Sequence, residues 1–134
     1  MALPATTIKN WTEFTGKPNN TIRSQGLRVT MGKRGEIYLN RIAWEALGEP
    51  EAVKLMFDFR RAVIGIQKVD PWIENTFPVY APKNSPGRII RANPFAVHHQ
   101  IKPSRTVIFN KAYMDEGVLT LPIRAITAVG LGSR

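Results

Sequence analysis

Cysteine is absent from this chain of 134 residues, and no apolar run approaches the length needed to cross a bilayer. Without thiols, neither disulfides nor cysteine-ligated metals can stabilise the fold or sense redox conditions. A spanning helix needs about 20 apolar residues, and the first residues, MALPATTIKNWTEF, lack a signal peptide's charged start and apolar core. We therefore expect a soluble cytoplasmic protein with no membrane partner, associated with the nucleoid if it binds DNA.

Catalytic and metal-binding motifs are missing as well. No serine lies in a nucleophile-elbow context, and no loop of the P-loop or dinucleotide-binding type is present. His98 and His99 are the only histidines, and adjacent positions on a helix diverge too far for both to bind one metal readily. We expect no enzyme, no catalytic residue, no cofactor and no metal site. An enzyme acting on an anionic substrate would require a pocket with perturbed carboxylates.

Acidic residues are scarce, and their scarcity is uneven. The net charge is +9, and no aspartate or glutamate lies between Glu74 and Asp115. The basic residues of that stretch are Lys83, Arg88, Arg91, Lys102, Arg105 and Lys111. A field of one sign attracts polyanions, of which nucleic acid is the commonest. The alternative is a basic surface that serves only solubility.

Apolar residues make up 43% of the chain, which is enough to fold one compact domain or two small units sharing a core. An order of strand, basic turn, strand, short helix and hairpin spans 28–69, and a similar order returns over 77–121. Gly35, Ile37 and Phe57 each have a like residue 52 positions later, and these are Gly87, Ile89 and Phe109. A duplicated unit of this size favours a two-fold arrangement built from one polypeptide.

The first unit, 27–70, has clear local signals. Alternating apolar residues predict strands over 27–31, 36–39, 54–59 and 62–69, with a glycine-flanked turn at 32–35 and a turn at Arg60-Arg61. Asn40 is a good N-cap for a helix over 41–47, and Gly48 is a good residue to end it. Residues 1–26 are expected to be an N-terminal arm that either packs through Trp11 and Phe14 or is a disordered leader.

The second unit, 71–123, is looser. Its strands are expected at 77–81 and 87–90, separated by a turn at 82–87. Asn93-Pro94 predicts an N-cap and first residue of a helix that runs to Gln100. Residues 106–110 and 118–121 are expected to form the last hairpin, with Asp115-Glu116-Gly117 in its turn, and 124–134 a frayed C-terminal tail.

The first unit resembles the AbrB/MraZ superfamily of bacterial DNA-binding proteins, which have the swapped-hairpin or looped-hinge fold. The residues that carry the resemblance are Val29-Thr30, Gly35, Ile37, Leu39, the helix end from Ala43 to Leu47-Gly48, and the hairpin 53–66. Asn40 stands where the family typically has proline, and Pro50-Glu51-Ala52 replaces its glycine-acid pair.

The resemblance implies a mainly β fold with short helices (α+β), in which two tandem ββαββ units form a pseudo-two-fold, barrel-like core. It implies a homo-oligomer, since AbrB-like proteins dimerise and MraZ proteins, with two copies in one chain, assemble into rings. It also implies a transcriptional regulator that binds double-stranded DNA through basic residues near the turn and the helix start. The matching positions are Arg28, Lys33, Arg34 and Arg41, and by internal analogy Lys83, Arg88 and Arg91.

The same residues also have other interpretations. The turn cations are equally typical of an ordinary surface, and Glu45, four residues after Arg41, would explain a cation at a helix start as well as a phosphate would. Trp11, Trp44 and Trp72 are expected to pack in a core or interface rather than to stack on bases. The rival function is a structural or protein-interaction module that keeps the fold without binding DNA.

Overall fold

The computed structural model describes residues 26–129, and these form a mainly β fold with two short helices. The strands are β1 (Val29–Met31), β2 (Glu36–Leu39), β3 (Ala52–Asp58), β4 (Val63–Val69), β5 (Phe77–Tyr80), β6 (Arg88–Arg91), β7 (Val107–Phe109), β8 (Tyr113–Asp115), β9 (Val118–Pro122) and β10 (Ile126–Ala128). The helices are α2 (Arg41–Ala46) and α3 (Asn93–His99). The expected fold class, mainly β with short helices, is confirmed.

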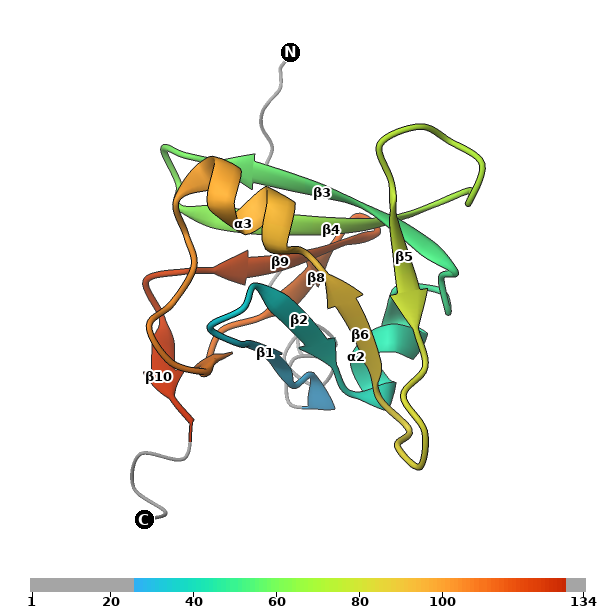
Figure 1. The fold of residues 1–134 in the computed structure, drawn as a ribbon, viewed down its shortest axis with the longest axis horizontal. Coiled ribbons are helices and arrows are strands. Elements are labelled where there is room, and N and C mark those ends of the chain that lie inside the picture. The colour runs from blue at the N-terminus through green and yellow to red at the C-terminus, as the bar shows by residue number, and fades with distance from the viewer. Residues whose placement is uncertain (1–25, 130–134) are drawn as a thin grey trace.

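One sheet contains all ten strands, in the order β10-β7-β1-β2-β6-β5-β3-β4-β9-β8. Every neighbouring pair in it is antiparallel. The sheet curls into a half-barrel in which β2 and β6 are the fourth and fifth strands, and α3 crosses β3 and β4 in this view (Figure 1). The curl creates an inner face that encloses the core and an outer face open to solvent.

Aliphatic side chains from strands distant in sequence fill the inner face. Ile37 of β2 lies directly opposite Ile90 of β6, and neither side chain is exposed to solvent. The other large side chains that are almost fully buried are Met31, Leu39, Ile64, Ile66, Leu119, Leu121, Val29, Val53 and Pro50. Full burial of an aliphatic side chain contributes about 1.5–3 kcal/mol, so this inner face supplies most of the driving force for the curl.

The β3–β4 hairpin agrees with the alternation of its sequence. Its seven ladder pairs run from Ala52 opposite Val69 to Asp58 opposite Val63. The turn includes Arg60 and Arg61 as expected, and Asp58 stabilises it by accepting a hydrogen bond from the Arg61 backbone N–H at 3.0 Å.

Helix α2 begins as its sequence predicts. The Asn40 side chain accepts a hydrogen bond from the Ala43 backbone N–H at 2.9 Å, which confirms it as the N-cap. Asn40 also accepts from the backbone N–H of Arg28 and donates to the carbonyl of Gly26. One side chain thus joins the helix start to the segment before β1. Gly48, at φ +92°, follows the helix in the left-handed region, as expected.

Helix α3 begins one residue earlier than predicted. Ala92 is the N-cap and makes no side-chain cap hydrogen bond, so the prediction that Asn93 caps the helix was wrong. The chain enters α3 directly from β6, and the Ala92 N–H donates to the carbonyl of Gly35. Pro94 lies in the first turn as expected, and Gln100 ends the helix in the left-handed conformation.

The last hairpin differs from the prediction. Strand β9 pairs with β8 and β4, whereas β7 pairs with β1 and β10. The predicted pairing of 106–110 with 118–121 was therefore wrong. Glu116 and Gly117 both have positive φ, and such a two-residue turn joins the strands on either side of it. Asp115 consequently lies opposite Val118 in the ladder, which leaves β7 free to pair elsewhere.

Both ends of the chain were predicted to lie outside the folded units. The segment expected as a C-terminal tail from Arg124 includes β10, whose Ile126 lies opposite Phe109. The expected N-terminal arm, with Trp11 and Phe14, falls outside the described residues apart from Gly26. In the part of the chain that the structure describes, no helix has the length and apolarity needed to span a bilayer.

Candidate nucleic-acid interface

Basic side chains from the β1–β2 turn, β6 and the segment after α3 gather at one end of the outer face of the β2–β6 pair. Because directly opposite residues share a face, Glu36 and Arg91 form one outward pair and Tyr38 and Ile89 the next. The inward pair between them in sequence is Ile37 and Ile90. Burial of that inward pair fixes which side chains of both strands point to solvent.

The turn between β1 and β2 is held against the start of α3 by a glycine. Gly35 has φ +87°, and a Cβ atom there would lie 2.8 Å from the Asn93 Cα. The Gly35 N–H donates to the Gly32 carbonyl at 2.9 Å, which closes the turn. Only glycine tolerates both the backbone conformation and the close approach. The turn that carries Lys33 and Arg34 is thereby fixed beside the β6–α3 junction.

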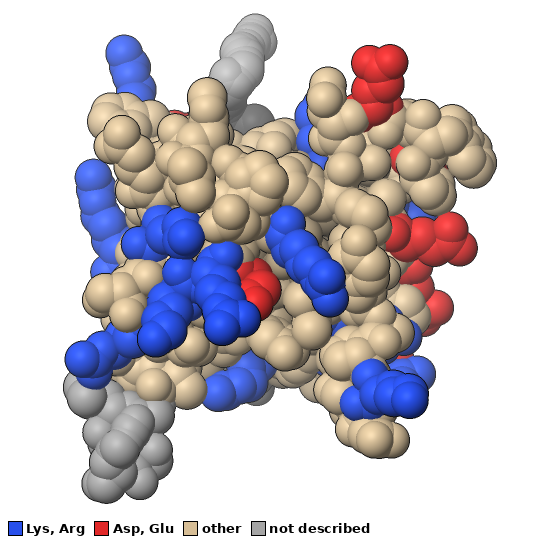
Figure 2. Space-filling model, viewed as in Figure 1, with Lys and Arg blue, Asp and Glu red and all other residues tan. Residues whose placement is uncertain are grey.

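Three cations from three segments meet there around a shallow depression of about 600 Å³. Its lining residues are Arg34, Glu36, Ile89, Arg91, Asn93 and Lys102, and we call this site the basic depression. It contains three cations and one carboxylate, and among residues 26–129 no ion pair involves any of them. Figure 2 shows basic side chains gathered over the β1–β2 turn around an acidic group. The local field favours an anion.

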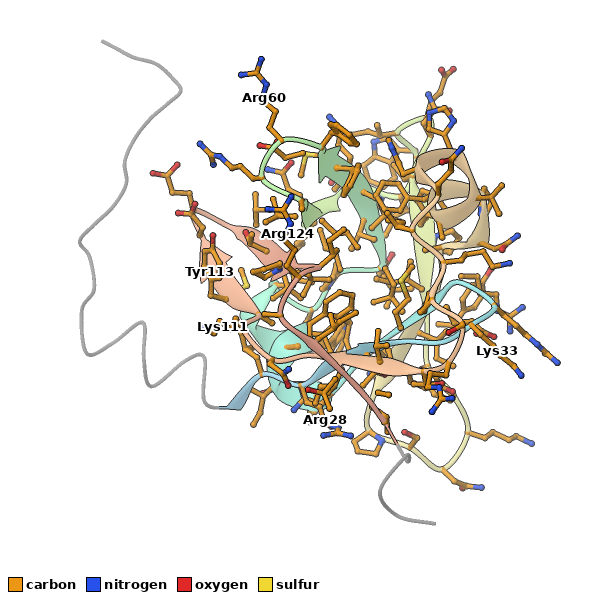
Figure 3. All side chains as sticks on the ribbon, turned by 90° about the vertical axis from the view of Figure 1, so that its left-hand side faces the viewer. Arg28, Lys33, Arg60, Lys111, Tyr113 and Arg124 are labelled. Carbon is orange, nitrogen blue, oxygen red and sulfur yellow. The ribbon has the colours of Figure 1, made fainter. Side chains whose placement is uncertain are left out.

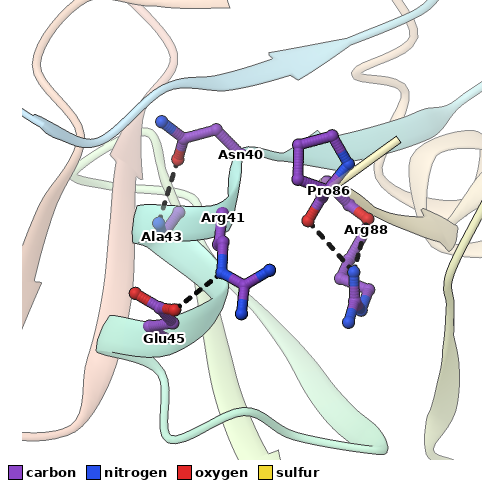
Figure 4. Close-up of polar contacts among 7 residues, drawn as sticks. Asn40, Arg41, Ala43, Glu45, Pro86 and Arg88 are labelled. Atoms are coloured by element: carbon purple, nitrogen blue, oxygen red, sulfur yellow. Dashed lines mark hydrogen bonds and ion pairs between the residues drawn. The ribbon is translucent and has the colours of Figure 1, made fainter. Parts of the chain in front are cut away.

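At the other end of β2 and β6 the cations have protein partners. Arg41 Nε lies 2.8 Å from Glu45 Oε2, the intrahelical pair that the sequence left open. The Arg88 guanidinium lies 3.8 Å from the centre of the Trp44 ring. It also donates to the carbonyls of Pro86 and Gly87 (Figure 4). Arg88 therefore has a packing role in addition to its charge.

The remaining predicted contact residues do not share one direction. Arg28 and Lys33 point to different sides of the molecule (Figure 3). Lys83 is exposed in the β5–β6 turn. The structure thus brings Arg34 and Arg91 into one site together with Lys102, and it distributes the other predicted cations along the ends of β2 and β6 and beyond.

Sequence reasoning did not nominate Lys102, Tyr38 or Tyr80 as site residues. Lys102 lies in the acid-free stretch, but its position depends on how the chain returns after α3. The two tyrosines are 46% and 42% exposed, and both project from strands whose alternate residues are buried or half-buried. The period-2 pattern of β2 is the signal that would have placed Tyr38 on the outer face.

The tryptophans divide into different environments. Trp44 is half-buried, and its indole N–H donates to the Pro50 carbonyl at 3.1 Å. Trp72, in the β4–β5 connection, is 80% exposed and does not pack in the core of this chain. Trp11 lies outside the described residues.

Among residues 26–129, two titratable groups have clearly shifted pKa values, and both lie outside the basic depression. Burial, with a smaller contribution from the charge of His98, lowers the pKa of His99, whose ring contacts Phe57 and Phe95 at centroid distances of 4.9 and 4.8 Å. Burial and then the charge of Asp115 raise the pKa of Tyr113, which Arg61 partly opposes. Tyr113 therefore keeps its hydroxyl proton at neutral pH.

The chemistry available at the basic depression is charge pairing and hydrogen bonding with an anion. Arginine presents a planar donor fork suited to phosphate oxygens, and lysine a mobile point charge. Residues 26–129 contain no group of three or more histidine, cysteine, aspartate or glutamate side chains placed to hold a metal ion. Comparisons of the chain with family models, with curated proteins and with solved structures found no match.

Proposed function

We propose that this chain is a non-enzymatic DNA-binding protein, a transcriptional regulator of AbrB/MraZ type, which holds double-stranded DNA on the outer face of β2 and β6. The observation that carries the proposal is the basic depression, where Arg34, Arg91 and Lys102 face a single carboxylate. Exposed cations that make no ion pair within residues 26–129 are available to phosphate groups at little desolvation cost.

The registers of the sheet support a pseudo-two-fold arrangement of two units. A shift of 53 residues carries Ile37 onto Ile90, which lies directly opposite it, and the pair Glu36–Arg91 onto the pair Ile89–Tyr38, so the β2–β6 ladder is compatible with a two-fold axis through the Ile37–Ile90 pair. On one side of this ladder β1 is followed by β7, and on the other β5 is followed by β3. Each unit's first hairpin thus pairs with a strand of the other unit, which is the connectivity of swapped hairpins.

Two glycines that lie 52 positions apart make related contacts. Gly35 approaches Asn93 at the β6–α3 junction, and a Cβ at Gly87 would lie 2.9 Å from the Leu39 carbonyl oxygen, just before α2. Each turn is therefore pressed against the strand–helix junction of the other unit. The correspondence does not extend to Phe57 and Phe109. Phe57 lies several residues beyond the part of β3 that meets β5, whereas Phe109 directly follows the part of β7 that meets β1.

The positions of the cations at both ends of the β2–β6 pair fit a duplex. A strand of four residues spans about 13 Å, which is close to the roughly 12 Å width of the DNA major groove. Arg34 and Arg91 lie at one end and Arg41 at the other, whereas Arg88, directly opposite the buried Leu39, lies on the inner side of β6. The exposed Arg41–Glu45 ion pair contributes only about 0–1 kcal/mol, so Arg41 can exchange Glu45 for a phosphate.

A second function, a structural or interaction module that does not bind DNA, is favoured by a different observation. Phe59 and Trp72 are 83% and 80% exposed, and large exposed aromatics are typical of protein–protein interfaces. This alternative predicts a homo-oligomer whose assembly is unaffected by nucleic acid. Sedimentation of the full chain with and without duplex DNA distinguishes the two functions.

The test of DNA binding uses fluorescence anisotropy with a labelled duplex over a range of salt concentrations. Each neutralised phosphate contributes about 0.9 to the slope of log K against log salt. Replacing Arg34, Arg91 and Lys102 by alanine is expected to make this slope less negative by up to about 2.7. A matched variant removes the same charge from exposed residues elsewhere, namely Arg60, Lys111 and Arg124 (Figure 3).

The matched variant is expected to lose much less affinity and slope than the depression variant. An equal loss in both variants would mean that net charge alone attracts DNA. No binding of the wild-type chain at low salt would refute the proposal.

A further inference from the structure

We propose that the same outer face binds unpaired DNA bases by stacking, so that the protein prefers duplex DNA containing a locally melted stretch to fully paired duplex. This inference rests on the proposed DNA binding, and it adds a contact to the bases to the contacts with the phosphates. It is carried by a row of side chains that the sheet registers align across neighbouring strands.

The row crosses the outer face from β7 to β5 through directly opposite residues. Thr30 of β1 lies opposite both Ile108 of β7 and Tyr38 of β2. Ile89 of β6 lies opposite both Tyr38 and Tyr80 of β5. The order along the row is therefore Ile108, Thr30, Tyr38, Ile89 and Tyr80, and we call it the tyrosine row.

The tyrosine row is apolar in character but remains accessible to solvent. Tyr38 is 46% and Tyr80 42% exposed, whereas the inward neighbours of Tyr38 in β2 are almost completely buried. Neither tyrosine makes a side-chain hydrogen bond within residues 26–129. The core therefore does not require these rings, and an aromatic ring that is half exposed on a sheet is available to stack.

The cations border this row on one side. Ile89, between the two tyrosines, also lines the basic depression together with Arg34, Arg91 and Lys102. The Arg91 guanidinium lies 4.7 Å from the centre of the Tyr80 ring. A base can stack on an exposed tyrosine or on a guanidinium plane while the adjoining phosphate reaches the cations.

Charge complementarity identifies nucleic acid as the occupant of this face. A polyanion with flat apolar bases matches cations placed beside aromatic rings. In paired DNA the bases are stacked on one another and expose only their edges in the grooves, so a stacking surface distinguishes unpaired from paired bases. Stacking on aromatic side chains contributes about 1–3 kcal/mol per base and is tolerant of sequence.

The experiment compares the full chain with two variants, Y38L/Y80L and Y38F/Y80F, on three labelled probes. The probes are a short duplex, the same duplex with a central mismatched bubble, and one of its strands alone. We expect the wild type to bind the bubble more tightly than the duplex. Leucine at both positions is expected to weaken bubble binding by about 5- to 150-fold per stacked base and to leave duplex binding within about threefold, because leucine lacks a stacking ring and the phosphate contacts are unaltered.

The phenylalanine variant separates stacking from other effects. It keeps both rings and removes only the hydroxyl groups, so we expect it to bind like the wild type. Equal affinity of the wild type for duplex and bubble, or bubble binding unchanged in Y38L/Y80L, would refute base stacking and leave the proposed DNA binding intact. Tighter binding of an RNA strand than of the DNA strand of the same sequence would also overturn the assignment. No binding to any probe would refute the proposed function itself.

Discussion

Three glycines allow the contact between the β1–β2 turn and α3 to be measured separately from backbone strain. Gly35 combines φ +87° with a close approach, since a Cβ would lie 2.8 Å from a backbone atom of Asn93. Gly117 has φ +82°, but a Cβ there would have no neighbour within 4 Å. Gly87 provides the third case, with a Cβ position 2.9 Å from the Leu39 carbonyl oxygen and no positive φ.

The expected losses of unfolding free energy follow from these differences. An alanine in the left-handed region costs about 1–2 kcal/mol, and overpacking against rigid atoms costs about 1–3 kcal/mol. Gly117→Ala should therefore lose about 1–2 kcal/mol, Gly87→Ala about 1–3 kcal/mol, and Gly35→Ala about 2–5 kcal/mol.

Urea or thermal denaturation of the three variants measures these losses. For a chain of this length, between the smaller and larger domains for which the effect is known, each kcal/mol lowers Tm by about 4 °C, so the differences are resolvable. A Gly35→Ala variant no less stable than Gly117→Ala would refute the close contact between the turn and α3. A neutral Gly87→Ala would refute the corresponding contact of the second turn.

Three further predictions concern single side chains. Asn40→Ala should lower the unfolding free energy by about 1 kcal/mol through loss of the α2 cap, measured by urea denaturation. Because burial lowers the pKa of His99 below its ordinary value of 6.5, the unfolded chain binds more protons near and below pH 6.5 and stability should fall as the pH drops through that range. His99→Leu, which keeps an apolar contact to Phe57, should flatten this dependence in denaturation curves between neutral and mildly acidic pH. Arg88→Lys should lower stability by about 1–2 kcal/mol through loss of the Trp44 stacking and carbonyl hydrogen bonds while keeping the charge, so DNA affinity should change less than stability.

Local features of the fold were predictable from the sequence. Asn40 and Gly48 mark the ends of α2 because their preferences concern only a few neighbouring residues. The β3–β4 hairpin followed from alternation on both sides of Arg60-Arg61, since strands adjacent in sequence need no knowledge of the rest of the chain.

The parts that were missed depend on contacts between distant residues. Strand β10 has three residues, and its partner β7 precedes it by a long connection that contains the β8–β9 hairpin. Three residues give too short a period to reveal a strand. The cap of α3 was misplaced because the Ala92 N–H donates to the distant Gly35 carbonyl as well as to the nearby Ile90 carbonyl, and no local pattern reveals the distant contact.

The candidate site likewise combines a feature visible in the sequence with contacts between distant residues. The acid-free stretch contains Arg91 and Lys102, two of the three cations of the basic depression. That these residues meet Arg34 follows from the β2–β6 pairing, which no local pattern encodes. The spacing of four residues had already suggested Glu45 as a partner of Arg41, whereas only the structure places Arg88 against Trp44.

The most direct test of the central claim, that DNA occupies the outer face of β2 and β6, is a map of backbone amide chemical shifts during titration with a duplex. The account predicts that the largest changes fall in the β1–β2 turn and in β2 and β6, including Arg34, Tyr38 and Arg91. It predicts little change in β8 and β9. The largest changes in β8, β9 or the β3–β4 turn, with β2 and β6 unaffected, would contradict it.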